Sequence, residues 1–264
     1  MRFDTFVRLK YGSLFETWAD THRVSLAKCN QCGHRWYPVV PNDEVLAKMY
    51  ETALPLKRTA GDGQQPTKQM VARMRQLRGL AGQEARLLDF GSGNCRWARA
   101  AIEAGFQVTA FEPNKNRGSI ANSEENFLFV SDYSALIGSK FDVIHVEQVL
   151  EHLSRPFDVL TGLKKLINPH GLIIVRVPNV AKEEILRPIW ETWPFDGTSP
   201  HVMAPFEHIQ GYTPRSLEAL VNRAGFEALP LFKLALYMPK HVLHRLASHI
   251  HPSVGQTQIV AIKK

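Results

Sequence analysis

The chain has 264 residues, of which 44% are hydrophobic and 22% are charged, so it is long enough for one α/β domain with an extension and too apolar for a disordered chain. No apolar run approaches the roughly 18 residues that span a bilayer, and the first residues lack the apolar stretch of a secretory signal. Three cysteines cannot form a disulfide framework. We therefore expect a cytoplasmic protein.

The net charge of +7 is spread unevenly along the chain. Residues 1–84 carry 13 basic and 8 acidic side chains (+5), residues 85–229 carry 14 and 17 (−3), and residues 230–264 carry 5 and none (+5). Basic ends could attract an anionic partner. No Lys/Arg-rich tract or basic stripe with interleaved aromatic residues is present, so nucleic acid is a disfavoured partner.

Residues 1–66 are interpreted as an N-terminal extension. Its first part is rich in turn-forming residues and contains the motif Cys29-Asn30-Gln31-Cys32-Gly33-His34, which is expected to form a hairpin. A short lid helix is expected over 43–51. Glycine and proline then occur at linker density over 54–66, which predicts a loop.

From residue 67 the pattern predicts an α/β domain that extends to residue 264. Apolar residues recur at helical spacing over 67–80. Residues 85–178 then alternate short apolar runs with amphipathic segments, and a helix opened by Thr-Pro is expected over 214–224. The apolar runs are ARLLDF, FQVTAF, FLFV, FDVIHV and GLIIVRV. Continuous apolar strands that alternate with helices are typical of a parallel sheet covered on both faces.

The strongest functional signal is a glycine turn between a strand and a helix. The first strand ends at Phe90, and the chain turns through Gly91-Ser92-Gly93. Glycines are needed where the backbone turns tightly against a ligand. Glu112 ends the next strand, where an acid can accept both hydroxyls of a ribose. The pattern predicts a site for an adenosine-containing cofactor.

Two cofactors compete for this site. A dinucleotide fingerprint requires a third glycine near the start of the helix, but Arg96 is found there. The carboxylate of Asp89 would repel a pyrophosphate, whereas it suits a ligand that carries an ammonium and a sulfonium. S-adenosylmethionine is therefore favoured over NAD, whose oxidoreductase chemistry is the disfavoured alternative.

At this point the sequence resembles the small-molecule branch of the class I S-adenosylmethionine-dependent methyltransferases. The resemblance covers residues 67–264 and includes the glycine turn, the acid after the second strand, Ser131-Asp132-Tyr133, the block Val149-Leu150-Glu151-His152-Leu153, and His208-Ile209-Gln210-Gly211-Tyr212-Thr213. It implies a Rossmann-like, doubly wound, mostly parallel seven-stranded sheet with an N-terminal helical and hairpin extension.

The resemblance also implies a role for each matching residue. Asp89, Gly91 and Gly93 would hold the aminoacyl end of the cofactor, and Glu112 would hold the ribose. Asp132 would contact the adenine amino group, Tyr133 would flank the ring, and Glu147 and Gln148 would lie beneath the methionine part. The family often has a third glycine where this chain has Cys95, which we expect to be a tolerated variant.

His152 and His208 are the candidate catalytic residues. Each could be a general base, or it could shape the pocket. Some quinone- and RNA-modifying relatives bind a divalent metal through a Glu-x-x-Glu-His block. This chain has Gln148 at the first of those positions, and an amide is a poorer ligand for a hard cation, so metal dependence is disfavoured.

The CxxC motif resembles one half of a zinc ribbon. Cys29 and Cys32 could bind zinc only with two further ligands, and the spacing of His22 and His34 matches no known finger. A degenerate hairpin without metal is therefore favoured, and bound zinc is the alternative.

The loop at 188–213 carries Trp190, Trp193, Phe195, Phe206 and Tyr212, which are expected to form an acceptor pocket rather than a cluster that anchors the loop. The predicted reaction is an in-line methyl transfer to a small, anionic or sugar-like metabolite. The alternatives are a nucleic-acid methyltransferase and a binding module without turnover. The acceptor atom and the oligomeric state are left open.

Overall fold

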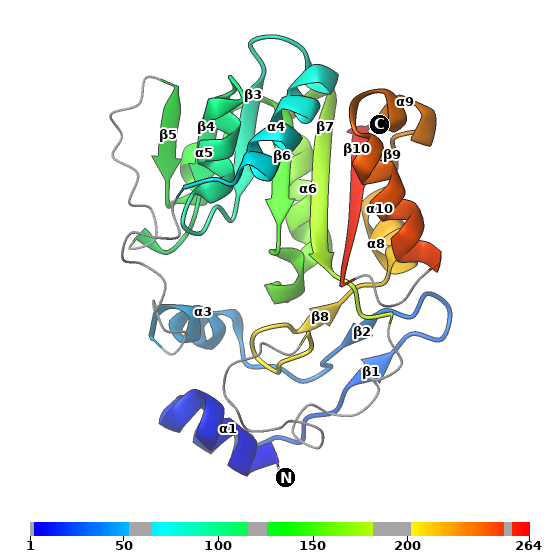
Figure 1. Cartoon of the computed structure of the whole chain (residues 1–264). Coiled ribbons are helices and arrows are strands. Elements are labelled where there is room, and N and C mark those ends of the chain that lie inside the picture. The colour runs from blue at the N-terminus through cyan, green and yellow to red at the C-terminus, as the bar shows by residue number, and fades with distance from the viewer. Residues whose placement is uncertain (1–2, 53–64, 116–125, 182–201, 251–254) are drawn as a thin grey trace.

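A seven-stranded sheet forms the centre of the protein in the computed structural model, which describes residues 3–52, 65–115, 126–181, 202–250 and 255–264 (Figure 1). The strand order is β5-β4-β3-β6-β7-β10-β9. The first five strands in this order pair in parallel, and β10 runs antiparallel to both of its neighbours. The strands are β3 (Arg86–Phe90), β4 (Gln107–Phe111), β5 (Phe127–Val130), β6 (Phe141–Glu147), β7 (Ile167–Pro178), β9 (Phe226–Ala228) and β10 (Gln256–Lys263). The predicted Rossmann-like, mostly parallel seven-stranded sheet is confirmed.

Helices cover both faces of this sheet because its central strands are apolar on both sides. One face packs against α4 (Lys68–Ala81), α5 (Arg96–Glu103), α9 (Leu231–Tyr237) and α10 (Pro239–Ile250). The other face packs against α6 (Pro156–Leu166) and α8 (Pro214–Arg223). Thr213 caps α8 by accepting a hydrogen bond from the backbone N–H of Ser216, as the Thr-Pro start predicts.

The N-terminal segment forms a separate layer below the carboxyl ends of the strands (Figure 1). It contains α1 (Phe3–Tyr11), η1 (Gly12–Phe15), α2 (Glu16–Thr21), β1 (Ala27–Lys28), β2 (Arg35–Trp36) and α3 (Asp43–Thr52). Strands β1 and β2 form the hairpin expected around the CxxC motif, and β2 pairs with β8 (Gln210–Gly211). The division of the chain at residue 66 stays a prediction.

A third hydrophobic core joins the N-terminal segment to residues that follow β7. The ring of Phe206 stacks on that of Phe15 with the ring centroids 4.4 Å apart, and Phe206 is 1% exposed. Tyr212 is also buried, against the core beneath α8. The expectation that these two aromatic residues line an acceptor pocket is therefore wrong, because packing against the extension removes Phe206 from solvent and packing beneath α8 removes Tyr212. Trp190, Trp193 and Phe195 lie outside the described residues.

Among the residues that the structure describes, no helix combines the length and the apolar character that a membrane span needs.

Candidate functional site

The glycine turn predicted from the sequence lies at the carboxyl end of β3. The backbone N–H groups of Gly91 and Ser92 both donate to the carbonyl oxygen of Phe111, at 2.8 and 2.9 Å, so the turn is fixed to the end of β4. Gly91 has a φ of +76°, and a Cβ atom at this position would lie 2.5 Å from Cγ2 of Val149. Only glycine allows both this conformation and this close approach.

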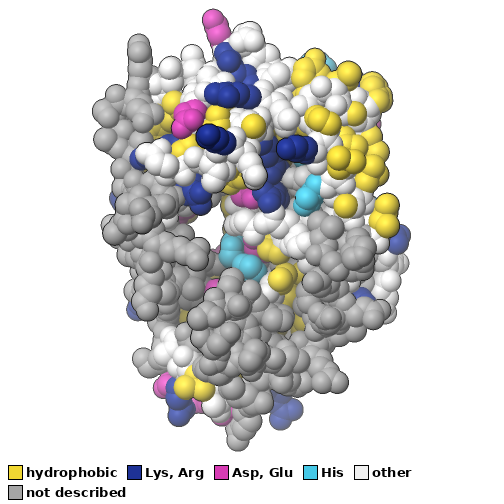
Figure 2. Space-filling view, in the orientation of Figure 1, with side chains coloured by type: hydrophobic (Ala, Val, Ile, Leu, Met, Phe, Trp, Pro, Cys, Tyr) yellow, Lys and Arg dark blue, Asp and Glu magenta, His cyan; other side chains and the backbone are white. Residues whose placement is uncertain are grey.

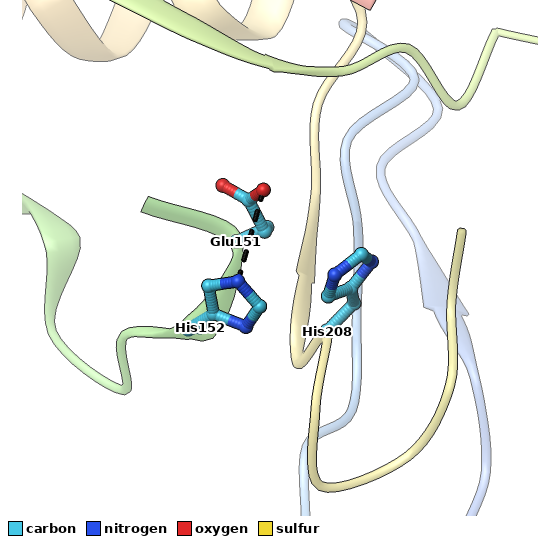
Figure 3. Close-up of side chains that lie close together, drawn as sticks. All are labelled: Glu151, His152 and His208. Carbon is cyan, nitrogen blue, oxygen red and sulfur yellow. Dashed lines mark ion pairs between the residues drawn. The ribbon is translucent and has the colours of Figure 1, made fainter. Parts of the chain in front are cut away.

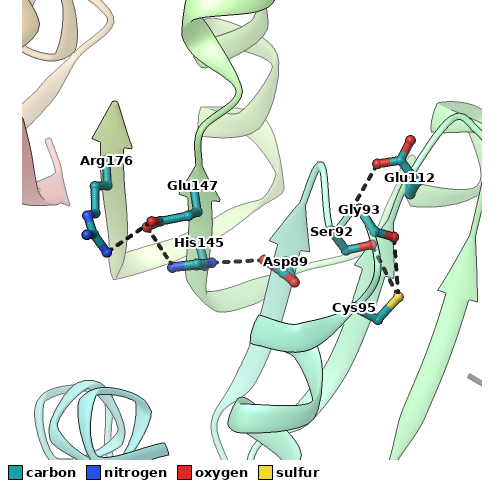
Figure 4. A network of polar contacts seen from close by, with 8 residues as sticks. All are labelled: Asp89, Ser92, Gly93, Cys95, Glu112, His145, Glu147 and Arg176. Atoms are coloured by element: carbon teal, nitrogen blue, oxygen red, sulfur yellow. Dashed lines mark hydrogen bonds and ion pairs between the residues drawn. The ribbon is translucent and has the colours of Figure 1, made fainter. Parts of the chain in front are cut away.

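Glu112 fastens the other side of the same turn (Figure 4). Its Oε2 accepts a hydrogen bond from the backbone N–H of Gly93 at 3.0 Å, and its Oε1 accepts one from that of Asn114 at 3.1 Å. A carboxylate has about four lone-pair positions, so two remain for ligand hydroxyls. Cys95 is the residue just before α5, and its φ is +55°. Glycine adopts this left-handed conformation without strain, which explains why a glycine suits this position.

A row of ionisable side chains crosses the sheet beside the turn (Figure 4). Oδ1 of Asp89 lies 2.9 Å from Nδ1 of His145, whose Nε2 lies 3.7 Å from Oε2 of Glu147. Arg176 then pairs with Glu147 at 3.0 Å. The sequence reasoning missed His145 and Arg176, although each has apolar residues directly before and after it in its strand.

A cavity of about 1050 Å³ lies beneath the carboxyl ends of β3, β4 and β6. Its lining includes eight of the residues singled out from the sequence: Asp89, Gly91, Gly93, Glu112, Tyr133, Glu147, Gln148 and His152. Helix α3 contributes Asp43, Leu46 and Ala47 to the wall, as a lid helix would. Oδ2 of Asp89 is buried and, among the described residues, accepts no hydrogen bond. This unsatisfied anionic atom fits the cationic end of S-adenosylmethionine.

Asp132 is not among the residues that line the cavity, although the next residue, Tyr133, is. The side chain of Asp132 is exposed. Asp132 caps the start of η3 (Tyr133–Leu136), because its carboxylate accepts a hydrogen bond from the backbone N–H of Ser134. That hydrogen bond also keeps the pKa of the carboxyl group below its usual value. An adenine contact at Asp132 stays a prediction.

The two candidate catalytic histidines lie side by side, and His152 lines the cavity (Figure 3). His152 ends η4 (Leu150–His152), and its ring lies 4.7 Å from that of His208. Nδ1 of His152 donates to the carbonyl oxygen of Glu207 at 2.6 Å, and Nδ1 of His208 donates to that of Val202 at 2.8 Å. Because a carbonyl oxygen only accepts, Nε2 carries the lone pair in the neutral form of each ring.

Glu151 completes this group, with ligand atoms of all three residues within 4.8 Å of one another. Its carboxyl oxygens are buried without a hydrogen-bond partner in the described part of the chain, and burial raises its pKa to about 8. Two imidazoles and a carboxylate could hold a divalent cation, and they could equally receive a proton. The sequence reasoning named His152 and His208 but did not place them together with Glu151, because His208 lies 56 residues after His152.

The side chains of the histidines considered for a zinc site at the CxxC motif make other contacts. His22 stacks on Trp18, and Nε2 of His34 lies 2.9 Å from Oε1 of Gln210. Within the described ranges, no third His, Cys, Asp or Glu ligand joins Cys29 and Cys32. The Cys29 backbone N–H instead donates to the carbonyl oxygen of His34, which closes the hairpin. Zinc binding stays a disfavoured alternative.

The sequence is similar to those of known methyltransferases. A family model described as a methyltransferase domain matches residues 63–231. The "Ubiquinone biosynthesis O-methyltransferase" of Actinobacillus pleuropneumoniae serotype 5b is 30% identical over 114 residues, which cover 38% of this chain and 48% of that protein. The protein of the same name from Thiobacillus denitrificans is 24% identical over 165 residues, 59% of this chain and 63% of its own. The chain thus spans about half to two thirds of these curated relatives.

Solved structures show the same fold. The [4+2]-cyclase SpnF is 16% identical, with a TM-score of 0.55 over 85% of this chain and 97% of its own. A SAM-dependent methyltransferase from Archaeoglobus fulgidus is 17% identical, with a TM-score of 0.50 over 74% of this chain and 94% of its own. Since one neighbour is named as a cyclase, fold alone does not decide the reaction. The family match over residues 63–231 does decide the family, and the chain belongs to the S-adenosylmethionine-dependent methyltransferases.

Proposed function

We propose that this protein transfers a methyl group from S-adenosylmethionine to a hydroxyl group of a small-molecule acceptor. The single observation that carries the proposal is the position of His152. It lines the same cavity as Asp89 and Glu112. Because its Nδ1 donates to the carbonyl oxygen of Glu207, its Nε2 is the nitrogen that can accept a proton. The names of the curated relatives, which are O-methyltransferases of a small-molecule pathway, support a hydroxyl acceptor over a nucleic acid.

The cavity walls offer complementary groups for each part of the cofactor. Asp89 provides a buried carboxylate for its ammonium group, and Glu112 provides lone pairs for the ribose hydroxyls. The ring of Tyr133 lies at the adenine side of the cavity in this proposal. A volume of about 1050 Å³ exceeds what one drug-sized ligand commonly fills, so an acceptor fits beside the cofactor.

When bound, S-adenosylmethionine supplies a methyl carbon that its sulfonium already activates. The acceptor oxygen attacks this carbon in line, so that the new C–O bond forms as the C–S bond breaks and S-adenosylhomocysteine leaves. His152 takes the hydroxyl proton on Nε2 and later releases it to water. The protein otherwise contributes orientation and exclusion of water, with α3 closing the cavity.

Two measurements on the full chain test this function. Calorimetry should detect S-adenosylhomocysteine binding. A panel of matched hydroxyl, amine and acidic-carbon acceptors, assayed by mass spectrometry, should give methylation of the hydroxyl compounds. His152→Ala should lower turnover by about 10²-fold or more, whereas His249→Ala, at an exposed position on α10, should not. Absence of cofactor binding would support a module without turnover, and methylation of only amine or carbon acceptors would reject the hydroxyl.

A further inference from the structure

The outward sides of helices α9 and α10 are apolar. On α10, Leu243, Leu246 and Ile250 are exposed, and Ile250 is 80% exposed. They are spaced by three and four positions, so they form one stripe along the helix. On α9, Phe232 and Leu236 are exposed and lie four positions apart, and Leu236 is 77% exposed. Both helices therefore present large apolar side chains away from the protein.

The inward side of α10 is polar. His241 and Ser248, which lie seven positions apart, are both buried against the protein. Arg245 is also largely buried, and it pairs with Glu218 of α8 at 3.3 Å. A surface helix that faces water has the reverse arrangement, with its apolar stripe toward the core and its polar side outward. The pattern of α10 is thus that of a helix whose outward side meets an apolar surface.

The apolar stripes of the two helices form one face. Helices α9 and α10 pack against each other, and Figure 2 shows hydrophobic side chains gathered over both of them at the upper right of the view. Contiguous apolar patches of this kind mark interaction surfaces. We call this patch the α9–α10 face, and its residues are Leu231, Phe232, Leu236, Tyr237, Leu243, Leu246 and Ile250.

The charged side chains of α9 and α10 are all basic. Besides the paired Arg245, they are Lys233 and Lys240, and both of these lysines are exposed. No acidic residue follows Glu227 of β9 as far as the end of the sequence at Lys264. The two helices therefore combine an apolar face with positive charge.

Helix α4 extends this positive charge beside the α9–α10 face. It packs against α9, where the ring of Tyr237 lies next to Gly79. Its charged residues are Lys68, Arg73, Arg75 and Arg78, all of them basic. Figure 2 shows Lys and Arg side chains next to the hydrophobic patch on this side of the molecule. The charge around the patch is complementary to an anionic surface.

We propose that the α9–α10 face docks on a membrane surface that contains anionic lipids. Leucine, isoleucine and phenylalanine on the outward side of a helix, with lysines beside them, are typical of helices that lie in the bilayer interface. The long lysine side chains can reach the headgroups while their stems stay among apolar groups. A second copy docked through the same face would bring basic surfaces together, so charge favours the anionic membrane.

This docking surface is distinct from the cofactor cavity. Among the described residues that line the cavity, none belongs to the α9–α10 face. The proposal therefore stands independently of the proposed methyl transfer, and its test measures binding to vesicles and not turnover.

Sedimentation of the full chain with vesicles tests the docking. One set of vesicles contains phosphatidylcholine alone, and the other contains phosphatidylcholine and phosphatidylglycerol in equal parts. The protein should bind the anionic vesicles at least tenfold more tightly at low salt, since each lysine near an anionic surface contributes about fivefold. In about 1 M NaCl this preference should disappear, because salt screens the charges of the lysines and the headgroups.

Variants with matched controls separate the apolar and the basic contributions. Leu236→Ser should weaken binding to anionic vesicles by about tenfold or more, because a leucine side chain no longer enters the bilayer. Its control is Ile137→Ser, since Ile137 is 73% exposed outside the α9–α10 face. Lys240→Gln should weaken binding about fivefold, whereas Lys28→Gln, at an exposed position on β1, should not. Urea denaturation should show that the four variants keep the stability of the wild type.

Three results would overturn the proposal. Absence of vesicle binding, or equal binding to both kinds of vesicle, would reject an anionic membrane. Binding to anionic vesicles that Leu236→Ser leaves unchanged would place the contact on another face. A dimer in analytical ultracentrifugation that Leu236→Ser dissociates, in a protein that binds neither kind of vesicle, would assign the face to a second copy of the chain.

Discussion

The backbone N–H of Gly93 donates a hydrogen bond to Oε2 of Glu112, 19 residues later in the chain, at 3.0 Å. One carboxylate therefore both shapes the glycine turn and faces the cavity. The acid after the second strand has a structural role as well as the expected contact with the ribose, and its replacement should affect both.

Glu112→Ala should weaken S-adenosylhomocysteine binding by about 1–3 kcal/mol, because the ligand loses charge-assisted hydrogen bonds and the turn loses its anchor. Calorimetry measures the affinity. Glu103→Ala is the matched control, since Glu103 is exposed at the end of α5. An unchanged affinity in Glu112→Ala would show that the ribose binds elsewhere.

Gly91→Ala should lower the free energy of unfolding by about 1–3 kcal/mol, since the new Cβ would lie 2.5 Å from Cγ2 of Val149 in a left-handed conformation. Urea denaturation measures this loss. The double variant with Val149→Ala should recover the part that is due to the clash. Gly138→Ala is the control: φ is +85° there but no atom lies within 4 Å, so only about 1 kcal/mol should be lost. Equal losses for both glycines would remove the argument for a close approach at Gly91.

The sheet and the residues that gather at the glycine turn could be predicted from the sequence because local patterns determine them. The apolar runs that became β3, β4, β6 and β7 are long enough to be buried on both faces. A glycine turn directly after such a strand allows few interpretations other than a ligand-binding turn. Asp89, Gly91 and Glu112 were found for this reason.

The rest of the site depends on contacts that no local pattern records. Arg73 of α4 and Arg176 of β7 are close enough for their charges to interact, and His208 meets His152 because residues that follow β7 pack against the N-terminal layer. The same packing buries Phe206 against Phe15, so the expectation that Phe206 lines an acceptor pocket was wrong. Charge and aromaticity alone did not show which side chains face the cavity.

The group of Glu151, His152 and His208 allows a direct test for a cation. The proposed base mechanism needs no metal ion, so protein dialysed against EDTA should retain its turnover within about twofold. The assay is the formation of S-adenosylhomocysteine before and after dialysis. A different result would assign the three side chains to a divalent cation: the dialysed wild type loses turnover, Mn²⁺ or Zn²⁺ restores it, and neither ion restores turnover in His208→Ala.

His241 should make the stability of the protein depend on pH. It is 4% exposed, and its surroundings include Arg73, Arg176, Arg245 and His244. Burial, followed by the charge of Arg73, lowers its pKa to about 3, against about 6.5 in an unfolded chain. The folded protein therefore holds a neutral ring. Its contribution to stability is complete above pH 6.5 and is lost as the pH falls from 6.5 toward 3.

Between pH 7.5 and pH 5.0 this difference in pKa predicts a loss of about 2 kcal/mol in the free energy of unfolding, because the unfolded chain binds a proton that the folded chain excludes. Urea denaturation at the two pH values measures it. His241→Met has no group that titrates there, so its own loss should be smaller by about that amount. His249→Gln, at an exposed position on the same helix, should keep the wild-type dependence. If His241→Met lost as much stability as the wild type, the buried ring would not be the source of the pH dependence.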